Sequence, residues 1–448
     1  MATPEDNSRG APEGNPLVAP EDSSLATPEN NSLAAPEDNS DAAVLARGEA
    51  TIRAAIQLGR AGEFTVVPEF ISISATDNCN LRCVMCPGHT GMTGPKLTLQ
   101  QADSLFAALG SNHIDFGSPR VLDMTAGEPM LNAELHLIFR RFKDAVPSGK
   151  ITVISNATLP IRGRVKEAFE LCDRIGLSID GATKATYERI RKGSNFENVV
   201  RNIRDVAILK DSGRECETLS IMFVAMDQNA HELPELVRLA SELGVPTVFA
   251  QAVEHRATPF LDGENIDFNM SPRELRGYLD EAWAEAKRLG VSFKPTNGLV
   301  ALSVEAEPTP SAGHAETSPT QTATRFQTRV KFCHVPWINS PRFNLDKDAL
   351  RLGTVCCHMP ETEKEGDLAQ YPELRGASIN EIFNSRAYWD VREGLLDGTL
   401  AKGACKGCQY YESTQWSAAQ LRELEAAVSS AVSIVAIDAA LPLVDPIG

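Results

Sequence analysis

The strongest constraint on the fold is a regular alternation of two hydrophobic periodicities between residues 70 and 251. Short β-rich runs with strand-like composition alternate with segments whose apolar residues recur at helical spacing. The runs are Phe70–Ala75, Val121–Thr125, Ile151–Ser155, Arg174–Ile179, Leu219–Ala225 and Thr247–Gln251. The helical segments are Leu99–Leu109, Ala133–Ala145, Val165–Leu171, Phe196–Leu209 and Leu233–Leu243. Strand and helix in regular turn predict right-handed βαβ units and a mainly parallel sheet, open or closed into a barrel.

Small polar groups follow several of these predicted strands. Gly127-Glu128-Pro129 comes after the second run, Ser155-Asn156 ends the third, and Ser178 lies near the end of the fourth. Ligands of parallel sheets bind where the strands end, so these residues are expected on one rim. A glycine lets a ligand approach the backbone closely, and a carboxylate accepts hydrogen bonds from an ammonium group.

A cysteine-rich loop follows the first run. Cys79, Cys83 and Cys86 are spaced so that three thiolates from one short segment can bind one metal centre. Structural zinc is an alternative, because His89 follows at another two-residue gap and would complete a four-ligand set. A zinc site would need none of the polar groups on the other strands, which favours an iron–sulfur cluster.

Together these motifs resemble the radical S-adenosylmethionine (radical SAM) superfamily. The resemblance covers about residues 70–255 and includes the Cys-x3-Cys-x2-Cys loop, Gly-Glu-Pro and Ser-Asn. It continues in Leu177-Ser178-Ile179-Asp180-Gly181, in Tyr187-Glu188-Arg189-Ile190-Arg191 and in Phe196. It implies a partial (β/α)6 barrel. The family often has an aromatic residue before the third cysteine, where this chain has Met85.

The resemblance implies a chemistry and a set of site residues. Cys79, Cys83 and Cys86 would bind three irons of a 4Fe-4S cluster, and S-adenosylmethionine (SAM) would chelate the fourth iron. Gly127, Glu128 and Pro129 would receive the SAM ammonium group, whereas Ser155, Asn156 and Ser178 would contact its ribose or carboxylate. Reductive cleavage of SAM would release a 5′-deoxyadenosyl radical that abstracts a substrate hydrogen atom, with a flavodoxin or ferredoxin as electron donor.

A second cysteine group lies near the carboxyl end of the chain. Cys333, the pair Cys356-Cys357, Cys405 and Cys408 suit either a zinc site or a second iron–sulfur cluster. With the radical SAM motifs upstream, they resemble the SPASM/twitch extension in its shorter form, which implies one auxiliary 4Fe-4S cluster. Neighbours on an extended segment face opposite sides, so one of Cys356 and Cys357 should be a ligand, and we favour Cys356. Four protein ligands would make this cluster an electron relay.

Composition excludes several other classes. The chain has 448 residues and a net charge of −17, with no basic stripe for nucleic acid and no confident membrane span. Pro-Glu recurs at positions 4, 12, 20, 28 and 36 in units too polar to fold, which predicts a disordered acidic tail. The absence of a secretory signal pattern and the clustered cysteines favour reduced thiols and a cytoplasmic protein.

These observations predict the domain order and the function. We expect a disordered tail at 1–40, a helix and lead-in at 41–69 capped by Asp41, a barrel at 70–290, a linker at 291–330, an auxiliary domain at 331–412 and a C-terminal helix and tail at 413–448. We expect a radical SAM oxidoreductase or epimerase acting on a sugar-like metabolite. The alternatives are a peptide-modifying maturase and, more remotely, a non-catalytic zinc-binding interaction protein.

Overall fold

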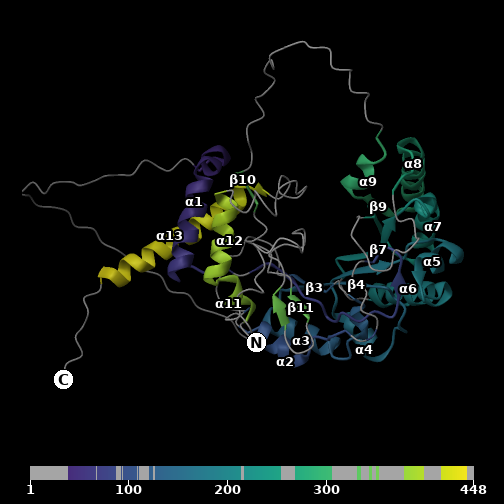
Figure 1. Cartoon of the computed structure of the whole chain (residues 1–448), viewed down its shortest axis with the longest axis horizontal. Coiled ribbons are helices and arrows are strands. Elements are labelled where there is room, and N and C mark those ends of the chain that lie inside the picture. Colours follow the sequence, from purple (N-terminus) through teal and green to yellow (C-terminus); the bar gives the residue numbers. More distant parts are fainter. Residues whose placement is uncertain are drawn as a thin grey trace, which may run out of the picture. The chain divides into compact units, whose positions relative to one another are not determined.

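A computed structural model contains a seven-stranded parallel sheet with strand order β1-β3-β4-β5-β7-β8-β9. Figure 1 shows strands of this sheet with helices packed around them. The structure describes residues 39–66, 68–86, 92, 94–107, 109, 121–124, 127–212, 216–253, 268–304, 330–333, 343–345, 350–352, 378–397 and 415–440. The strands are β1 (Phe70–Ser72), β3 (Val121–Met124), β4 (Lys150–Ser155), β5 (Arg174–Ser178), β7 (Thr218–Ala225), β8 (Thr247–Ala252) and β9 (Ser292–Pro295). The α/β fold with a parallel sheet is therefore confirmed.

The strand β9 corrects the predicted strand number. The sequence predicted six strands and a linker at 291–330, but Ser292–Pro295 pairs in parallel with β8, and Val248 lies opposite Phe293. A four-residue strand that ends in proline carries too little periodicity to stand out. Its pairing depends on the neighbouring β8, which a local sequence pattern does not report.

The helices between the strands confirm the predicted alternation. They are α2 (Leu99–Leu105), α3 (Leu135–Ala145), α4 (Gly163–Leu171), α5 (Lys184–Ile190), α6 (Phe196–Asp211), α7 (Leu233–Leu243), α8 (Pro272–Leu289) and α9 (Asn297–Ala301). On α3 the apolar residues Leu135, Ile138, Phe139 and Phe142 are buried, which is the i, i+3, i+4, i+7 stripe of a helix that covers a sheet. Almost all residues of β3 and β5 are buried, as expected for parallel strands covered by other elements.

Helices from the two ends of the described chain pack together. Helix α1 (Asp41–Ala61) contacts α12 (Arg386–Leu396) and α13 (Ala418–Ala440), and α11 (Ile379–Phe383) precedes α12. The predicted cap at Asp41 is wrong by one residue, because the Ser40 hydroxyl accepts the hydrogen bond from the Ala43 amide. The N-terminal helix thus belongs to the same packed core as the C-terminal helices.

Gly59 of α1 lies directly against the indole ring of Trp389 in α12. A Cβ atom at residue 59 would overlap that ring, so we expect Gly59→Ala to lower the free energy of unfolding by about 1–3 kcal/mol through overpacking. The matched control is Gly277→Ala in α8, where a Cβ atom meets nothing within 4 Å. This control should stabilise the protein by about 0.5–1 kcal/mol. Urea unfolding of both variants tests the pair, and equal shifts in the same direction would contradict it.

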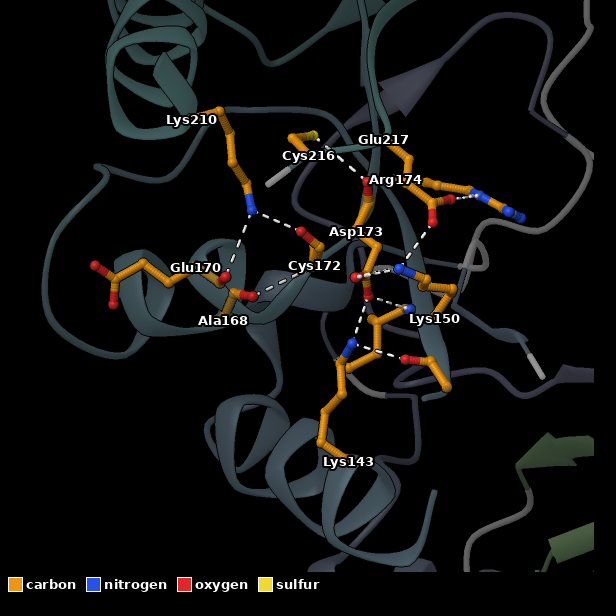
Figure 2. A network of polar contacts seen from close by, with 12 residues as sticks. Lys143, Lys150, Ala168, Glu170, Cys172, Asp173, Arg174, Lys210, Cys216 and Glu217 are labelled. Carbon is orange, nitrogen blue, oxygen red and sulfur yellow. Dashed lines mark hydrogen bonds and ion pairs between the residues drawn. The ribbon is translucent and has the colours of Figure 1, made fainter. Parts of the chain in front are cut away.

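A network of charged side chains lies at the amino ends of β4, β5 and β7 (Figure 2). The Asp173 carboxylate accepts hydrogen bonds from Lys143 Nζ at 2.7 Å and from the Ile151 amide at 2.8 Å. Lys150 pairs with Glu217 at 2.8 Å and with Asp173 at 3.6 Å. The network joins three strands on the side opposite to their carboxyl ends, so its role is to stabilise the sheet.

Glu217 should contribute a pH-dependent part of this stability. Hydrogen bonds from Lys150 and then Arg174 lower the pKa of Glu217 from its usual value of 4.5. A carboxylate whose pKa is lower in the folded state stabilises fully above its unfolded pKa and loses that effect as the pH falls. We therefore expect Glu217→Gln to destabilise at pH 7 by less than about 1 kcal/mol, because the pair is half-exposed, and the difference should shrink below about pH 4.5. Urea midpoints across this range measure it; a difference that stays constant with pH would contradict it.

Short strands follow the sheet domain, in the region of the second cysteine group. They form the pairs β10 (Val330–Cys333) with β13 (Gln415–Trp416) and β11 (Phe343–Leu345) with β12 (Leu350–Leu352). Cys333 belongs to β10, but its side chain lies outside the described residues, as do Cys356, Cys357, Cys405, Cys408 and the tail 1–38. The auxiliary cluster and the disordered tail remain predictions. Among the described helices, none has the length and apolarity to cross a membrane.

Candidate functional site

The three cysteines lie in one loop at the carboxyl end of β1. Cys79 precedes the short strand β2 (Arg82–Cys83), Cys83 ends it, and Cys86 follows within three residues. Strand β2 pairs antiparallel with β6 (Arg191–Lys192), and the Val84 amide donates to the Ile190 carbonyl at 3.0 Å. These backbone bonds fix the loop, so the three half-buried thiols are presented from one segment.

Burial controls the protonation of two of these thiols. Burial raises the pKa of Cys83 to about 12, partly offset by the positive charge of Arg191. Burial also raises the pKa of Cys79. Without a metal, Cys79 and Cys83 are therefore neutral at pH 7, and metal binding would displace their protons. Among the described residues no three His, Cys, Asp or Glu side chains converge on a single metal position. A 4Fe-4S cluster instead takes separate thiolates on separate irons.

Glu128 joins the cysteine loop to the ends of β3 and β4. Its carboxylate accepts from the Ser155 hydroxyl at 2.7 Å and from the Asn156 amide at 2.6 Å. Its backbone amide donates to the Asn78 carbonyl at 2.8 Å, next to the first cysteine. Burial raises the pKa of Glu128, and the hydrogen bonds to its carboxylate oppose that rise. Through its side chain and its backbone amide, Glu128 therefore joins the cysteine loop to the polar end of β4.

Asn156 continues this link to the first cysteine. Its amide nitrogen donates to the Asn80 side-chain oxygen at 3.0 Å and lies 3.8 Å from Cys79 Sγ. The following residue, Ala157, has a positive φ of 55°, which is costly for a residue with a Cβ atom. The Ser155 hydroxyl and the Asn202 side chain hold that conformation through hydrogen bonds to the Ala157 amide and carbonyl. Backbone strain of this kind clusters at functional sites.

A buried ion pair lies beside the loop. Arg191 Nε donates to Asp180 at 2.6 Å, and Asp180 is fully buried. Burial alone would lower the pKa of Arg191, but the Asp180 carboxylate, with Cys83 and Tyr187, raises it above its usual value. Both residues belong to the sequence motifs described above, which imply no role for either of them. The available signal was an aspartate and an arginine in two neighbouring motifs, but only the fold shows that they meet.

The structure brings most of the predicted residues together. Glu128, Ser155, Asn156 and Cys79 form one connected network, and Gly127 and Pro129 flank Glu128. Ser178 is buried at the end of β5, the neighbour of β4, where its register partner is Met222. His89, the alternative zinc ligand, lies outside the described residues.

This fold and loop match a known family. Residues 73–240 match the model of the Radical SAM superfamily, so this part of the chain is a radical SAM domain. The family implies a 4Fe-4S cluster and SAM, and Cys79, Cys83 and Cys86 all lie within the matched residues.

Known proteins resemble the chain over part of its length. A probable GTP 3′,8-cyclase of Methanococcus maripaludis is 27% identical over 211 residues, covering 47% of this chain and 67% of that protein. A GTP 3′,8-cyclase of Rhizobium leguminosarum is 24% identical over 221 residues, covering 47% of this chain and 59% of that protein. Among solved structures, Streptococcus suis SuiB bound to S-adenosylmethionine aligns with a TM-score of 0.51 at 13% identity, over 75% of this chain and 70% of SuiB. That likeness concerns the fold.

Proposed function

We propose that this protein is a radical SAM enzyme that cleaves SAM reductively and abstracts a hydrogen atom from its substrate. The observation that carries the proposal is the Glu128 network, which links the loop of Cys79 to the polar ends of β3 and β4. A purely structural metal site would not require these hydrogen bonds between separate strands. When bound, the cluster supplies one electron to SAM, and the resulting 5′-deoxyadenosyl radical abstracts hydrogen.

The chain's own residues bind and orient SAM. Gly127 has a φ of 62° and lies against the carbonyls of Thr76 and Asn78, so the backbone reaches the rim where an ammonium group can donate. Glu128 and Pro129 complete this ammonium site. Ser155, Asn156 and Ser178 lie at the ends of adjacent strands and supply polar contacts to the ribose or carboxylate.

The proposed substrate is a sugar-like small metabolite, which the enzyme oxidises or epimerises. The second candidate is a cyclisation of a ribonucleotide, and the two relatives named GTP 3′,8-cyclases favour it. Both candidate substrates contain a sugar or sugar-like ring. A peptide substrate is the third candidate, so a substrate panel should include sugars, aminocyclitols, nucleotides and peptides.

The second cysteine group completes the proposal. Cys333, Cys356, Cys405 and Cys408 would bind one auxiliary 4Fe-4S cluster in a SPASM/twitch domain. With four protein ligands, this cluster would relay an electron rather than bind substrate. An acidic flavodoxin or ferredoxin in the cytoplasm would reduce the enzyme, and no role for nucleic acid or membrane is proposed.

The proposed function is tested with protein that is purified and assayed without oxygen. Purified protein should contain about eight irons and eight sulfides per chain. Reduced protein incubated with SAM should form 5′-deoxyadenosine, and the correct substrate should increase its rate. Zinc without sulfide would support the non-catalytic alternative, and reduced, cluster-loaded protein that leaves SAM intact would refute the enzyme proposal. A Cys405→Ala variant should still cleave SAM but lose net turnover, whereas full turnover by that variant would refute the relay role.

A further inference from the structure

Three polar side chains close a ring of hydrogen bonds beside the first cysteine of the loop. Asn80 Nδ2 donates to Thr158 Oγ1 at 2.8 Å, and Thr158 Oγ1 donates to Asn156 Oδ1 at 2.6 Å. Asn156 Nδ2 donates back to Asn80 Oδ1 at 3.0 Å. Each side chain therefore donates one hydrogen bond and accepts another within the ring, which joins the cysteine loop to the segment after β4.

The ring fixes the direction in which the Asn156 amide faces. The oxygen and nitrogen of an asparagine side chain are distinguished by their hydrogen-bond partners. The backbone N–H of Thr158 can only donate, so the amide atom 3.0 Å from it is the oxygen. The nitrogen therefore faces the cysteine loop. One of its N–H groups is used by Asn80, and the second is available to Cys79 Sγ at 3.8 Å.

The turn that carries Asn156 keeps a costly backbone conformation. Ala157 has a φ of 55°, and hydrogen bonds to the Ser155 hydroxyl and from the Asn202 side chain hold it there. With Ala157 in this left-handed conformation, the Thr158 amide meets the side chain of Asn156. Strain that the surrounding hydrogen bonds maintain is a sign that the geometry serves a functional site.

The Asn156 side chain has its hydrogen-bonding capacity filled by the protein. Its oxygen accepts from the Thr158 amide and hydroxyl, which occupies both lone pairs. Its two N–H groups face Asn80 and Cys79. Asn156 is also only 6% exposed. Any contact of Asn156 with SAM would therefore come from its backbone, whereas its side chain serves the first cysteine.

We propose that Asn156 is a positioning residue that donates an N–H···S hydrogen bond to the metal-bound Cys79 thiolate and raises the reduction potential of that metal centre. This inference rests on the proposed function. A neutral thiol is a weak acceptor, and its contact with Asn156 is long, whereas a thiolate accepts a shorter, charge-assisted bond. An added electron makes the cluster more negative, so a fixed donor stabilises the reduced state. Asn80 and Thr158 hold this donor in place.

Asn156→Ala removes the donor. Dithionite supplies the electron to cluster-loaded protein, and a titration followed by electron paramagnetic resonance measures the midpoint potential without SAM. The signal that is absent from Cys83→Ala identifies the cluster of this loop. At a fixed potential, the ratio of reduced to oxidised cluster should fall about threefold to tenfold, which is a midpoint about 28–59 mV lower for one electron. Resonance Raman spectra should show a higher Fe–S stretching frequency, because the sulfur loses a hydrogen bond.

Thr158→Val tests the ring without removing the donor. Valine has nearly the shape of threonine but no hydroxyl, so Asn80 loses an acceptor and the Asn156 oxygen loses one of its two donors. The midpoint potential should fall in the same direction by a smaller amount. Thr158→Ser restores the hydroxyl and should keep the wild-type potential. Equal falls in Thr158→Val and Thr158→Ser would overturn the role of the ring.

The matched control is Asn384→Ala, which removes an amide that bonds the backbone of Val66. Asn384 Nδ2 donates to the Val66 carbonyl, and Asn384 Oδ1 accepts from the Val66 amide, both at 2.7 Å. This control should lose stability and keep the wild-type midpoint potential. A wild-type midpoint and Raman spectrum in cluster-loaded Asn156→Ala would overturn the inference. If Asn156→Ala retains no cluster, an unchanged midpoint in Thr158→Val would overturn it.

Failure of this inference is distinguishable from failure of the proposed function. Reduction by dithionite tests the hydrogen bond and does not involve SAM. If wild-type protein shows the predicted differences from its variants but leaves SAM intact, the proposed function is wrong and the inference stands. If wild-type protein cleaves SAM and the variants keep its midpoint potential, the inference alone is wrong. Wild-type protein that contains zinc in place of iron would overturn both.

Discussion

Cys83→Ala is expected to lower 5′-deoxyadenosine formation by more than about 100-fold. Cys83 ends β2 in the middle of the three-cysteine loop. Loss of this proposed metal ligand should exceed the 10–100-fold loss typical of changes in the residues around a ligand. The variant should also retain less iron and sulfide per chain after reconstitution. Iron counting, absorbance near 400 nm and chromatography of the nucleoside product measure these effects.

Cys172→Ala is the matched control for the loss of a thiol. Cys172 is buried in the core beside the polar network of Figure 2, where its Sγ donates to the Ala168 carbonyl. Removing it should cost about 1 kcal/mol of stability and leave the iron content and SAM cleavage unchanged. Normal iron content and activity in Cys83→Ala would contradict the assignment of the loop.

Gly127→Ala is expected to lower the affinity for SAM by at least about tenfold. Gly127 has a φ of 62°, and a Cβ atom there would overlap the Thr76 carbonyl oxygen and lie 2.8 Å from that of Asn78. Both obstacles are backbone atoms of the segment that leads into Cys79, so they cannot rotate away. The change should therefore displace Glu128 and its hydrogen bonds. Equilibrium binding of SAM to the cluster-loaded variant measures the effect.

Gly62→Ala separates backbone strain from displacement of the site. Gly62 has a φ of 77°, but a Cβ atom there meets nothing within 4 Å. This control should lose about 1–2 kcal/mol of stability from its left-handed backbone and keep wild-type SAM affinity. If Gly127→Ala keeps wild-type SAM affinity as well, the close approach at Gly127 has no role in binding.

Much of the candidate site was predictable because its signals are local. The spacing of Cys79, Cys83 and Cys86 is a property of one loop, and Ser155-Asn156 is recognisable at the end of an apolar run. Helix α7 has the predicted bounds Leu233–Leu243, because its apolar stripe and the Gly244 cap are both encoded within a few residues. The position of these motifs on one rim follows from the rule that parallel strands share their carboxyl edge.

Contacts between distant segments were not predictable in the same way. The hydrogen bonds of Glu128 to Ser155 and Asn156 span 27 and 28 residues. The strand β9 depends on β8, and Gly59 meets Trp389 only because α1 packs on α12. None of these contacts leaves a periodic pattern in the sequence, because each residue could pack against several other parts of the chain.

The sequence by itself determined the alternation of strands and helices, the three-cysteine loop and the polar residues that follow the strands. Each of these depends on periodicity or spacing within a short segment. The tertiary structure decided that Glu128 ties the loop to β4, that Arg191 pairs with Asp180, and that the Asn156 amide faces Cys79. These features arise when separate segments bury their polar groups against one another, because a buried charge or amide must find its partner wherever the fold brings one.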